Sequence, residues 1–190
     1  MGKQKMLIDI TLRVTPDLSK EAQGNQDRSL VGHLGTHFDV MNKDFPLEYT
    51  RRQGVAFDVS TIRERDITSA DVNLSQVDRD MFVAFHTGYI EEVGYGNRTY
   101  FGQHPQLADE LIDKLLERGV SIIAVDCSGV RRGKEHTPKD QYCADRNCFV
   151  IENLCNLKTV VQNAGRFVAH TYPMHFAGMT GLPCRVIAEV

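Results

Sequence analysis

Leu107-Ala-Asp-Glu-Leu111-Ile-Asp-Lys-Leu115-Leu-Glu-Arg-Gly119-Val-Ser-Ile-Ile-Ala-Val125 carries the clearest secondary-structure signal in the sequence. Its numbered leucines recur at intervals of four and therefore lie on one face of a helix, which we predict over residues 106–118. Gly119 stands where a glycine typically closes the last turn of a helix. The apolar run over residues 120–125 is typical of a strand covered on both faces. A helix that leads directly into a buried strand indicates an α/β fold.

Five further segments have the composition of β-strands. They are short and rich in apolar residues, many of them β-branched or aromatic, and they cover residues 6–14, 54–59, 81–85, 148–151 and 185–188. The polar segment 15–32 contains Pro16 and Gly24, and we predict that it forms an exposed loop. Because no repeat, low-complexity tract or linker interrupts the chain, we predict one compact α/β domain over residues 1–190.

The composition is that of an ordinary globular protein. Hydrophobic residues make up 42% of the 190 residues and charged residues 25%, which excludes a mainly disordered chain. The net charge of −3 provides no basic field for nucleic acid or an anionic membrane, and no apolar run approaches the length of a membrane span. The five cysteines form no C-x-x-C pair, so we expect free thiols and a cytoplasmic location.

The segment His33-Leu-Gly-Thr-His37-Phe-Asp39 concentrates three common metal-ligand types. On a helix Asp39 would point away from the two histidines, whereas an extended chain turns all three side chains to the same side. A straight strand would separate the histidine Cα atoms by about 13 Å, and a bend at Gly35 would shorten that gap. Two imidazoles and a carboxylate suit zinc or manganese. Spacing alone leaves open that the histidines are half-buried, hydrogen-bonded structural residues.

The same segment resembles the signature His-x-Gly-Thr-His-x-Asp-x-Pro-x-His of the cyclase family, which includes bacterial kynurenine formamidases and isatin hydrolases. The resemblance continues in collinear order along nearly the whole chain. The other matching segments are Leu7–Thr11, Gly54–Val59, Arg65–Thr68, Asp80–Gly88, His104–Leu107, Gly119–Ser128, Ile151–Leu157 and Gly181–Ala188.

This resemblance implies a fold, an activity and a ligand set. The implied fold is a swivelling β/β/α-like domain with a mixed, partly barrel-like sheet, and the implied assembly is a homodimer or homotetramer. The implied activity is hydrolysis of a small amide, either a formamide or a cyclic amide, by metal-activated water. The implied metal is zinc first and manganese second, and the ligands carried over are His33, His37, Asp39 and Glu152.

Two positions depart from the family pattern. The final histidine of the signature, to which an acid–base role is often given, is Lys43 here, and a further histidine ligand falls on Asp140. Asp140 can still bind a metal through its carboxylate, and His136 can supply an imidazole from nearby. Lys43 can stabilise a developing oxyanion or pair with a substrate carboxylate, while Glu152 or Asp140 moves a proton to the leaving nitrogen.

These departures keep two alternatives open. One is a non-hydrolytic relative that binds a small ligand, or catalyses an elimination or isomerisation, at the same metal. The other is a cysteine hydrolase that uses Cys127 as its nucleophile, although the sequence supplies no base at a known spacing. His86 and His104 are interpreted as structural, and His104 is expected to make a capping or loop contact before Pro105.

Overall fold

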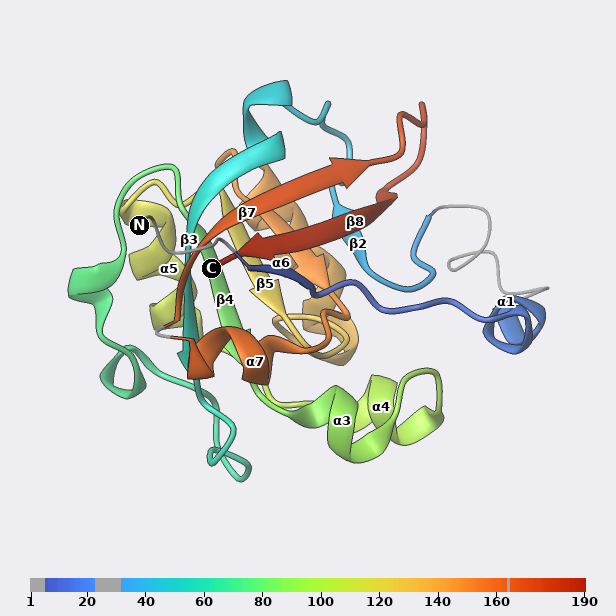
Figure 1. Ribbon diagram of the computed structural model, residues 1–190, viewed down its shortest axis with the longest axis horizontal. Coiled ribbons are helices and arrows are strands. Elements are labelled where there is room, and N and C mark those ends of the chain that lie inside the picture. The colour runs from blue at the N-terminus through green and yellow to red at the C-terminus, as the bar shows by residue number, and fades with distance from the viewer. Residues whose placement is uncertain (1–5, 23–31, 164) are drawn as a thin grey trace.

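The computed structural model describes residues 6–22, 32–163 and 165–190 (Figure 1). Its strands form one mixed sheet in the order β1-β8-β2-β6-β5-β4-β3-β7. An additional pairing between β7 and β8 closes seven of the eight strands into a ring, and β1 extends from β8. The strands are β1 (Leu7–Asp9), β2 (His37–Asp39), β3 (Arg51–Asp58), β4 (Phe82–His86), β5 (Ile122–Val125), β6 (Phe149–Glu152), β7 (Arg166–Pro173) and β8 (Gly181–Glu189). The prediction of a mixed, partly barrel-like sheet is confirmed.

The ring combines two kinds of strand pairing. Strands β3, β4, β5 and β6 are parallel neighbours. Strand β2 is antiparallel to both β6 and β8, so it lies between strands from the far end of the chain. The helices are α1 (Pro16–Ala22), α3 (Tyr89–Val93), α4 (Arg98–Gln103), α5 (Asp109–Glu117), α6 (His136–Ala144) and α7 (Leu157–Gln162). Of these, α3 to α6 lie in the connections from β4 to β5 and from β5 to β6.

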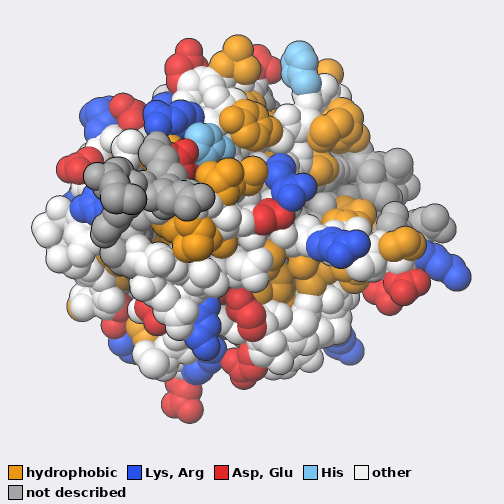
Figure 2. Space-filling model, in the orientation of Figure 1, with side chains coloured by type: hydrophobic (Ala, Val, Ile, Leu, Met, Phe, Trp, Pro, Cys, Tyr) orange, Lys and Arg blue, Asp and Glu red, His pale blue; other side chains and the backbone are white. Residues whose placement is uncertain are grey.

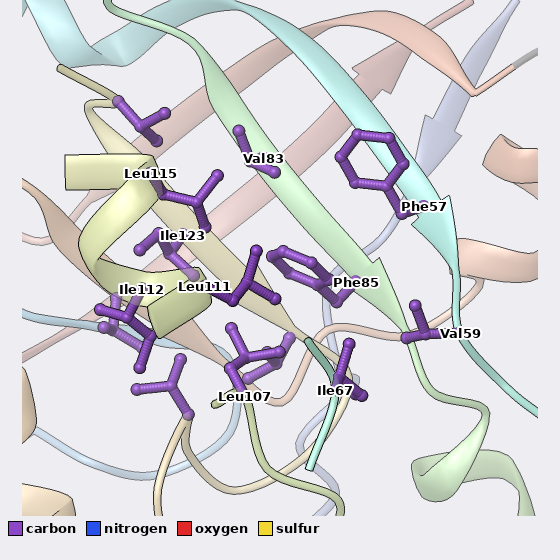
Figure 3. Close-up of a cluster of buried hydrophobic side chains, with 14 of the residues drawn as sticks. Phe57, Val59, Ile67, Val83, Phe85, Leu107, Leu111, Ile112, Leu115 and Ile123 are labelled. Atoms are coloured by element: carbon purple, nitrogen blue, oxygen red, sulfur yellow. The ribbon is translucent and has the colours of Figure 1, made fainter. Parts of the chain in front are cut away.

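The hydrophobic core has two parts, one on each face of the parallel strands. On one face, the leucine stripe of α5 packs on alternate residues of the strands, among them Val83, Phe85 and Ile123 (Figure 3). The intervening residues, such as Phe82 and Ala84, belong to the second cluster, to which α7 contributes Leu157 and Val160. Because both faces are covered, β5 is apolar throughout, as the run 120–125 predicted.

The local predictions agree with the structure at the strongly patterned segments. Helix α5 ends just before Gly119, which has φ of +72°, and all five other predicted strand segments contain or overlap a strand. The loop predicted over residues 15–32 is wrong where α1 forms, because Pro16 and Asp17 suit the first turn of a helix. The rest of that loop, residues 23–31, lies outside the described residues.

Short 3-10 helices lie in the connections between some of these strands and helices. They are Leu47–Thr50, Ser69–Asp71, Leu74–Gln76 and Gly133–Glu135. Among the described residues, no helix has the length and apolar character needed to cross a bilayer.

Candidate metal centre

The segment that contains His33, His37 and Asp39 folds back on itself before β2 begins. Gly35 has φ of +72°, a conformation that favours glycine, and this bend brings the rings of His33 and His37 to a centroid separation of 4.7 Å. Strand β2 then turns His37 and Asp39 to one face, and Phe38 to the second core cluster. The bend expected at Gly35 is therefore confirmed.

Two other elements bring further ligand-type side chains to this face. His37 lies opposite Glu152 in the β2–β6 register, with 3.7 Å between His37 Nε2 and Glu152 Oε2. His136 and Asp140 stand one turn apart on α6, with 3.2 Å between Nε2 and Oδ2. His136 Nε2 also lies 2.9 Å from Glu152 Oε1.

Together these side chains form two groups that share Asp39. The first group joins Asp39 to two histidines: Asp39 Oδ1 lies 3.2 Å from His33 Nδ1 and 3.5 Å from His37 Nε2. In the second group Asp39 joins His136, Asp140 and Glu152, and the four ligand-type atoms lie within 4.8 Å of one another. The structure thus brings together five of the predicted site residues and His136, the imidazole that the sequence offered near Asp140.

The chemistry of these atoms fits a divalent cation. Several of them are buried and make no well-aligned hydrogen bond in the described part of the chain: His37 Nε2, both carboxylate oxygens of Asp39, Asp140 Oδ1 and Glu152 Oε1. Buried carboxylate oxygens crowded together without well-aligned donors are unfavourable, and a cation bound among them would satisfy all of them at once. Imidazole nitrogens and carboxylate oxygens are ordinary ligands of zinc and manganese.

Hydrogen bonds to the outer nitrogens orient the two histidines of the first group. His37 Nδ1 lies 2.9 Å from the Gly35 carbonyl oxygen, which can only accept, so Nδ1 carries a proton and Nε2 is the nitrogen that faces Asp39. The amide of Asn153 donates to the same carbonyl at 2.9 Å. His33 Nε2 lies 2.9 Å from Thr180 Oγ1, which leaves Nδ1 directed at Asp39. Such outer contacts fix the orientation that a ligand needs.

Electrostatics also show that this site holds an excess of negative charge. Burial acts to lower the pKa of His37, but Asp39 and Glu152 outweigh it and raise that pKa to about 9. Burial likewise opposes the charged form of His136, and Glu152 and Asp140 raise its pKa to about 12. Burial first, and then repulsion from Asp39, raise the pKa of Asp140. Without a cation, protons supply the positive charge that the carboxylates require.

The backbone approaches this centre closely at Gly129. Its φ is +113°, and a Cβ added there would lie 3.1 Å from both Glu152 Oε1 and His136 Cε1. The same Cβ would come within 2.9 Å of the Arg131 carbonyl oxygen. Only glycine fits this position without displacing the ligand-type side chains.

Lys43 lies apart from this cluster. Its ammonium group forms an ion pair with Asp145 at 2.7 Å, and its side chain lines a separate cavity of about 860 Å³. That cavity lies between residues 40–50 and the hairpin of β7 and β8, and the six ligand-type side chains are not among its lining residues. Figure 2 shows one face of the molecule, and hydrophobic side chains gather in the upper half of that view. Among the residues that line the cavity, Leu47, Tyr172, Met174 and Phe176 have large exposed hydrophobic side chains.

Cys127 is not placed for nucleophilic catalysis. Its side chain is buried, and burial together with the neighbouring Asp126 raises the pKa of the thiol well above its ordinary value. A protonated, inaccessible thiol is unreactive, which argues against the cysteine hydrolase alternative.

The comparisons with known proteins agree with this fold. A family model described as "Putative cyclase" matches residues 8–131, and the chain belongs to this family. The comparison with curated proteins finds no match.

Solved structures of similar fold cover nearly the whole chain. A potential metal-dependent hydrolase with cyclase activity is 19% identical, with a TM-score of 0.77 and coverage of 98% of both chains. Isatin hydrolase A from Labrenzia aggregata is 18% identical, with a TM-score of 0.76 and coverage of 98% of this chain and 94% of the other. An isatin hydrolase bound to the product analogue thioisatinate is 17% identical, with a TM-score of 0.72 and coverage of 98% and 92%. At these identities the likeness establishes the shared fold.

Proposed function

We propose that this protein is a divalent-metal-dependent hydrolase of a small amide, either a formamide or a cyclic amide. The observation that carries the proposal is that buried imidazole nitrogens and carboxylate oxygens from β2, α6 and β6 converge without well-aligned hydrogen bonds. The family membership supports it, and the isatin hydrolases of similar fold make isatin a rational first substrate to test.

The two groups of ligand-type residues offer two places for a cation. His33, His37 and Asp39 would hold one cation, and Asp39 with His136, Asp140 and Glu152 would hold a second cation or complete the site of the first. A bound divalent cation supplies two things: a water whose pKa is lowered toward neutrality, and polarisation of the carbonyl that is attacked. Asp39 belongs to both groups and therefore fixes their separation.

The buried carboxylates can also move the proton that hydrolysis requires. Water adds its oxygen to the carbonyl carbon, the C–N bond breaks, and the leaving nitrogen gains a proton. Glu152 or Asp140 would receive the water proton and pass it to that nitrogen, and the burial of both carboxylates supports this role because it keeps bulk water from competing. The predicted oxyanion role of Lys43 stays a prediction, since its ammonium group is held by Asp145. Assembly into dimers or tetramers also stays a prediction.

The test is elemental analysis of purified protein after incubation with zinc or manganese and removal of free metal. We expect about one equivalent of metal, or about two if both groups fill, and a loss of at least one equivalent in His37→Ala. His170→Ala is the matched control, because His170 pairs with Glu189 outside the centre. Metal absent from the wild type, or unchanged in His37→Ala, would overturn the metal site.

Activity is then measured on a panel that contains formanilide and isatin. Release of formate or of the ring-opened acid, lost in His37→Ala and retained in His170→Ala, would support the hydrolase. Retained metal without hydrolysis of any amide would instead favour a non-hydrolytic relative that binds a small ligand at the same metal. The metal that restores more activity to chelated protein would identify the preferred ion.

A further inference from the structure

His104 is a second buried histidine with an unused nitrogen, and it lies outside both ligand groups. It follows α4 and precedes Pro105, and only 1% of its surface is exposed. Its Nδ1 lies 2.9 Å from the Pro105 carbonyl oxygen. Because a carbonyl can only accept, the proton is on Nδ1, and Nε2 is left as a bare acceptor. That Nε2 has no hydrogen-bond partner among the described residues.

The loop that follows His104 is hydrogen-bonded to the loop that contains Gly129, next to the candidate metal centre. The Leu107 N–H donates to the Val130 carbonyl at 3.0 Å, and the Arg132 N–H donates to Gln106 Oε1 at 2.8 Å. The second loop contains Gly129, where an added Cβ would lie 3.1 Å from both Glu152 Oε1 and His136 Cε1. His104 is therefore anchored beside the candidate centre by the backbone on which that centre depends.

The electrostatic surroundings of His104 agree with this placement. Burial lowers the pKa of His104 to about 4; the charge of Glu152 opposes this shift and the charge of His136 adds to it. The ring is therefore neutral near pH 7 and carries its proton on the nitrogen that faces Pro105. The free Nε2 can accept a hydrogen bond but cannot donate one.

We propose that His104 is a recognition residue whose Nε2 accepts a hydrogen bond from the N–H of the molecule bound at the candidate metal centre. The geometry favours primary and secondary amides, which carry an N–H, over tertiary amides and esters, which do not. This inference rests on the proposed function for the identity of the bound molecule, and it assigns the substrate feature that the centre selects. A buried acceptor discriminates strongly, because a ligand without a donor leaves it unpartnered.

The first test is nitrogen NMR of the histidine side chains in zinc-loaded wild-type protein. The His104 resonances are assigned by their absence from His104→Leu, or from His104→Asn if the leucine variant does not fold. We expect an unprotonated Nε2 that shifts when formamide is added and stays in place when N,N-dimethylformamide is added. The two probes share a carbonyl and differ in the N–H.

Three NMR results would overturn the proposal. They are a proton on Nε2, an Nε2 chemical shift that changes with neither probe, and an equal change with both probes. The first shows the opposite tautomer, the second a nitrogen that is inaccessible or already bound to water, and the third an effect unrelated to N–H donation. None of these results depends on hydrolysis, so a failure of the proposed function is distinguishable from a failure of this inference.

The second test is substrate preference, with formanilide and N-methylformanilide as the pair. We expect the wild type to favour the N–H amide by about tenfold or more in kcat/KM, as the loss of one buried hydrogen bond implies. His104→Leu should bring that ratio close to one while its metal content stays at the wild-type level. An unchanged ratio in His104→Leu with intact metal would contradict the recognition role.

Discussion

Gly129 shows how one residue can limit the geometry of the candidate centre. We predict that Gly129→Ala weakens zinc binding by about 10- to 100-fold, because the new Cβ would press on Glu152 and His136. Gly133→Ala is the matched control: Gly133 also has positive φ, at +58°, but a Cβ there meets nothing within 4 Å. Titration of metal-free protein with zinc, followed by calorimetry, measures both affinities.

Comparison of the two variants separates backbone strain from crowding. Both substitutions place an alanine at positive φ, so both should lower the stability of the fold, and Gly129→Ala should lower it more because its Cβ would also come within 2.9 Å of the Arg131 carbonyl oxygen. Only Gly129→Ala should lower zinc affinity. Equal zinc affinity in the two variants would show that the approach of Gly129 to the ligands has no role in metal binding.

His104 gives a pH dependence whose sign follows from its surroundings. Its folded-state pKa of about 4 is below the ordinary value of 6.5, so the unfolded chain binds the extra proton first as the pH falls. The free energy of unfolding should therefore be highest above pH 6.5 and should decrease toward pH 4, where the loss is nearly complete.

This contribution can be isolated by urea unfolding of metal-free protein. Between pH 7 and pH 5 the wild type should lose about 2 kcal/mol more stability than His104→Leu, because the variant has no imidazole to protonate. Parallel losses in the two proteins would mean that the ring is already solvated or charged in the folded state.

At the scale of secondary-structure elements, β2 connects the fold to the candidate centre. Its three residues alternate, so that Phe38 enters the core while its two neighbours face the ligand groups. Phe38 is fully buried and its ring lies tilted against that of Phe45, with 4.8 Å between the ring centroids. We predict that Phe38→Ala lowers the free energy of unfolding by about 3–5 kcal/mol, since it leaves a cavity beside β2.

Leu47→Ala is the control for this prediction. Leu47 is 79% exposed, and its truncation should change stability by less than about 0.5 kcal/mol. Chemical denaturation of both variants measures the difference. A small effect of Phe38→Ala would show that β2 is held by its backbone pairing rather than by its side chain.

The elements that the sequence predicts well are those whose pattern is local. The sequence predicts helix α5 from its leucine stripe and strand β5 from its apolar run, because in each case the residues that are buried lie within the element itself. Strand β2 is too short to show a pattern, and its extended form depends on β6 and β8 on either side. Helix α6 is largely polar, so its His136–Asp140 spacing was the only local signal of a shared face.

At the scale of the whole molecule, the candidate centre depends on contacts that no local pattern contains. The pairing of β2 with β6 places His37 opposite Glu152, more than one hundred residues later in the chain. Resemblance to the family indicated Glu152, and the sequence offered His136 nearby, whereas the contact of His136 with Glu152 and the ion pair of Lys43 with Asp145 required the folded structure. Sequence reasoning thus predicted the fold class and most ligand candidates, but not their division into two groups around Asp39.

Closure of the ring through β7 and β8 affects how the protein can self-associate. A closed sheet has no free hydrogen-bonding edge around its circumference, so a neighbouring molecule finds little backbone on which to add a strand. In the described part of the sheet, the remaining open edge belongs to β1, which is three residues long and carries the Asp9 carboxylate, paired with Arg185. Fibril-like aggregation should therefore require the barrel to open first, and its rate should follow unfolding rather than protein concentration alone.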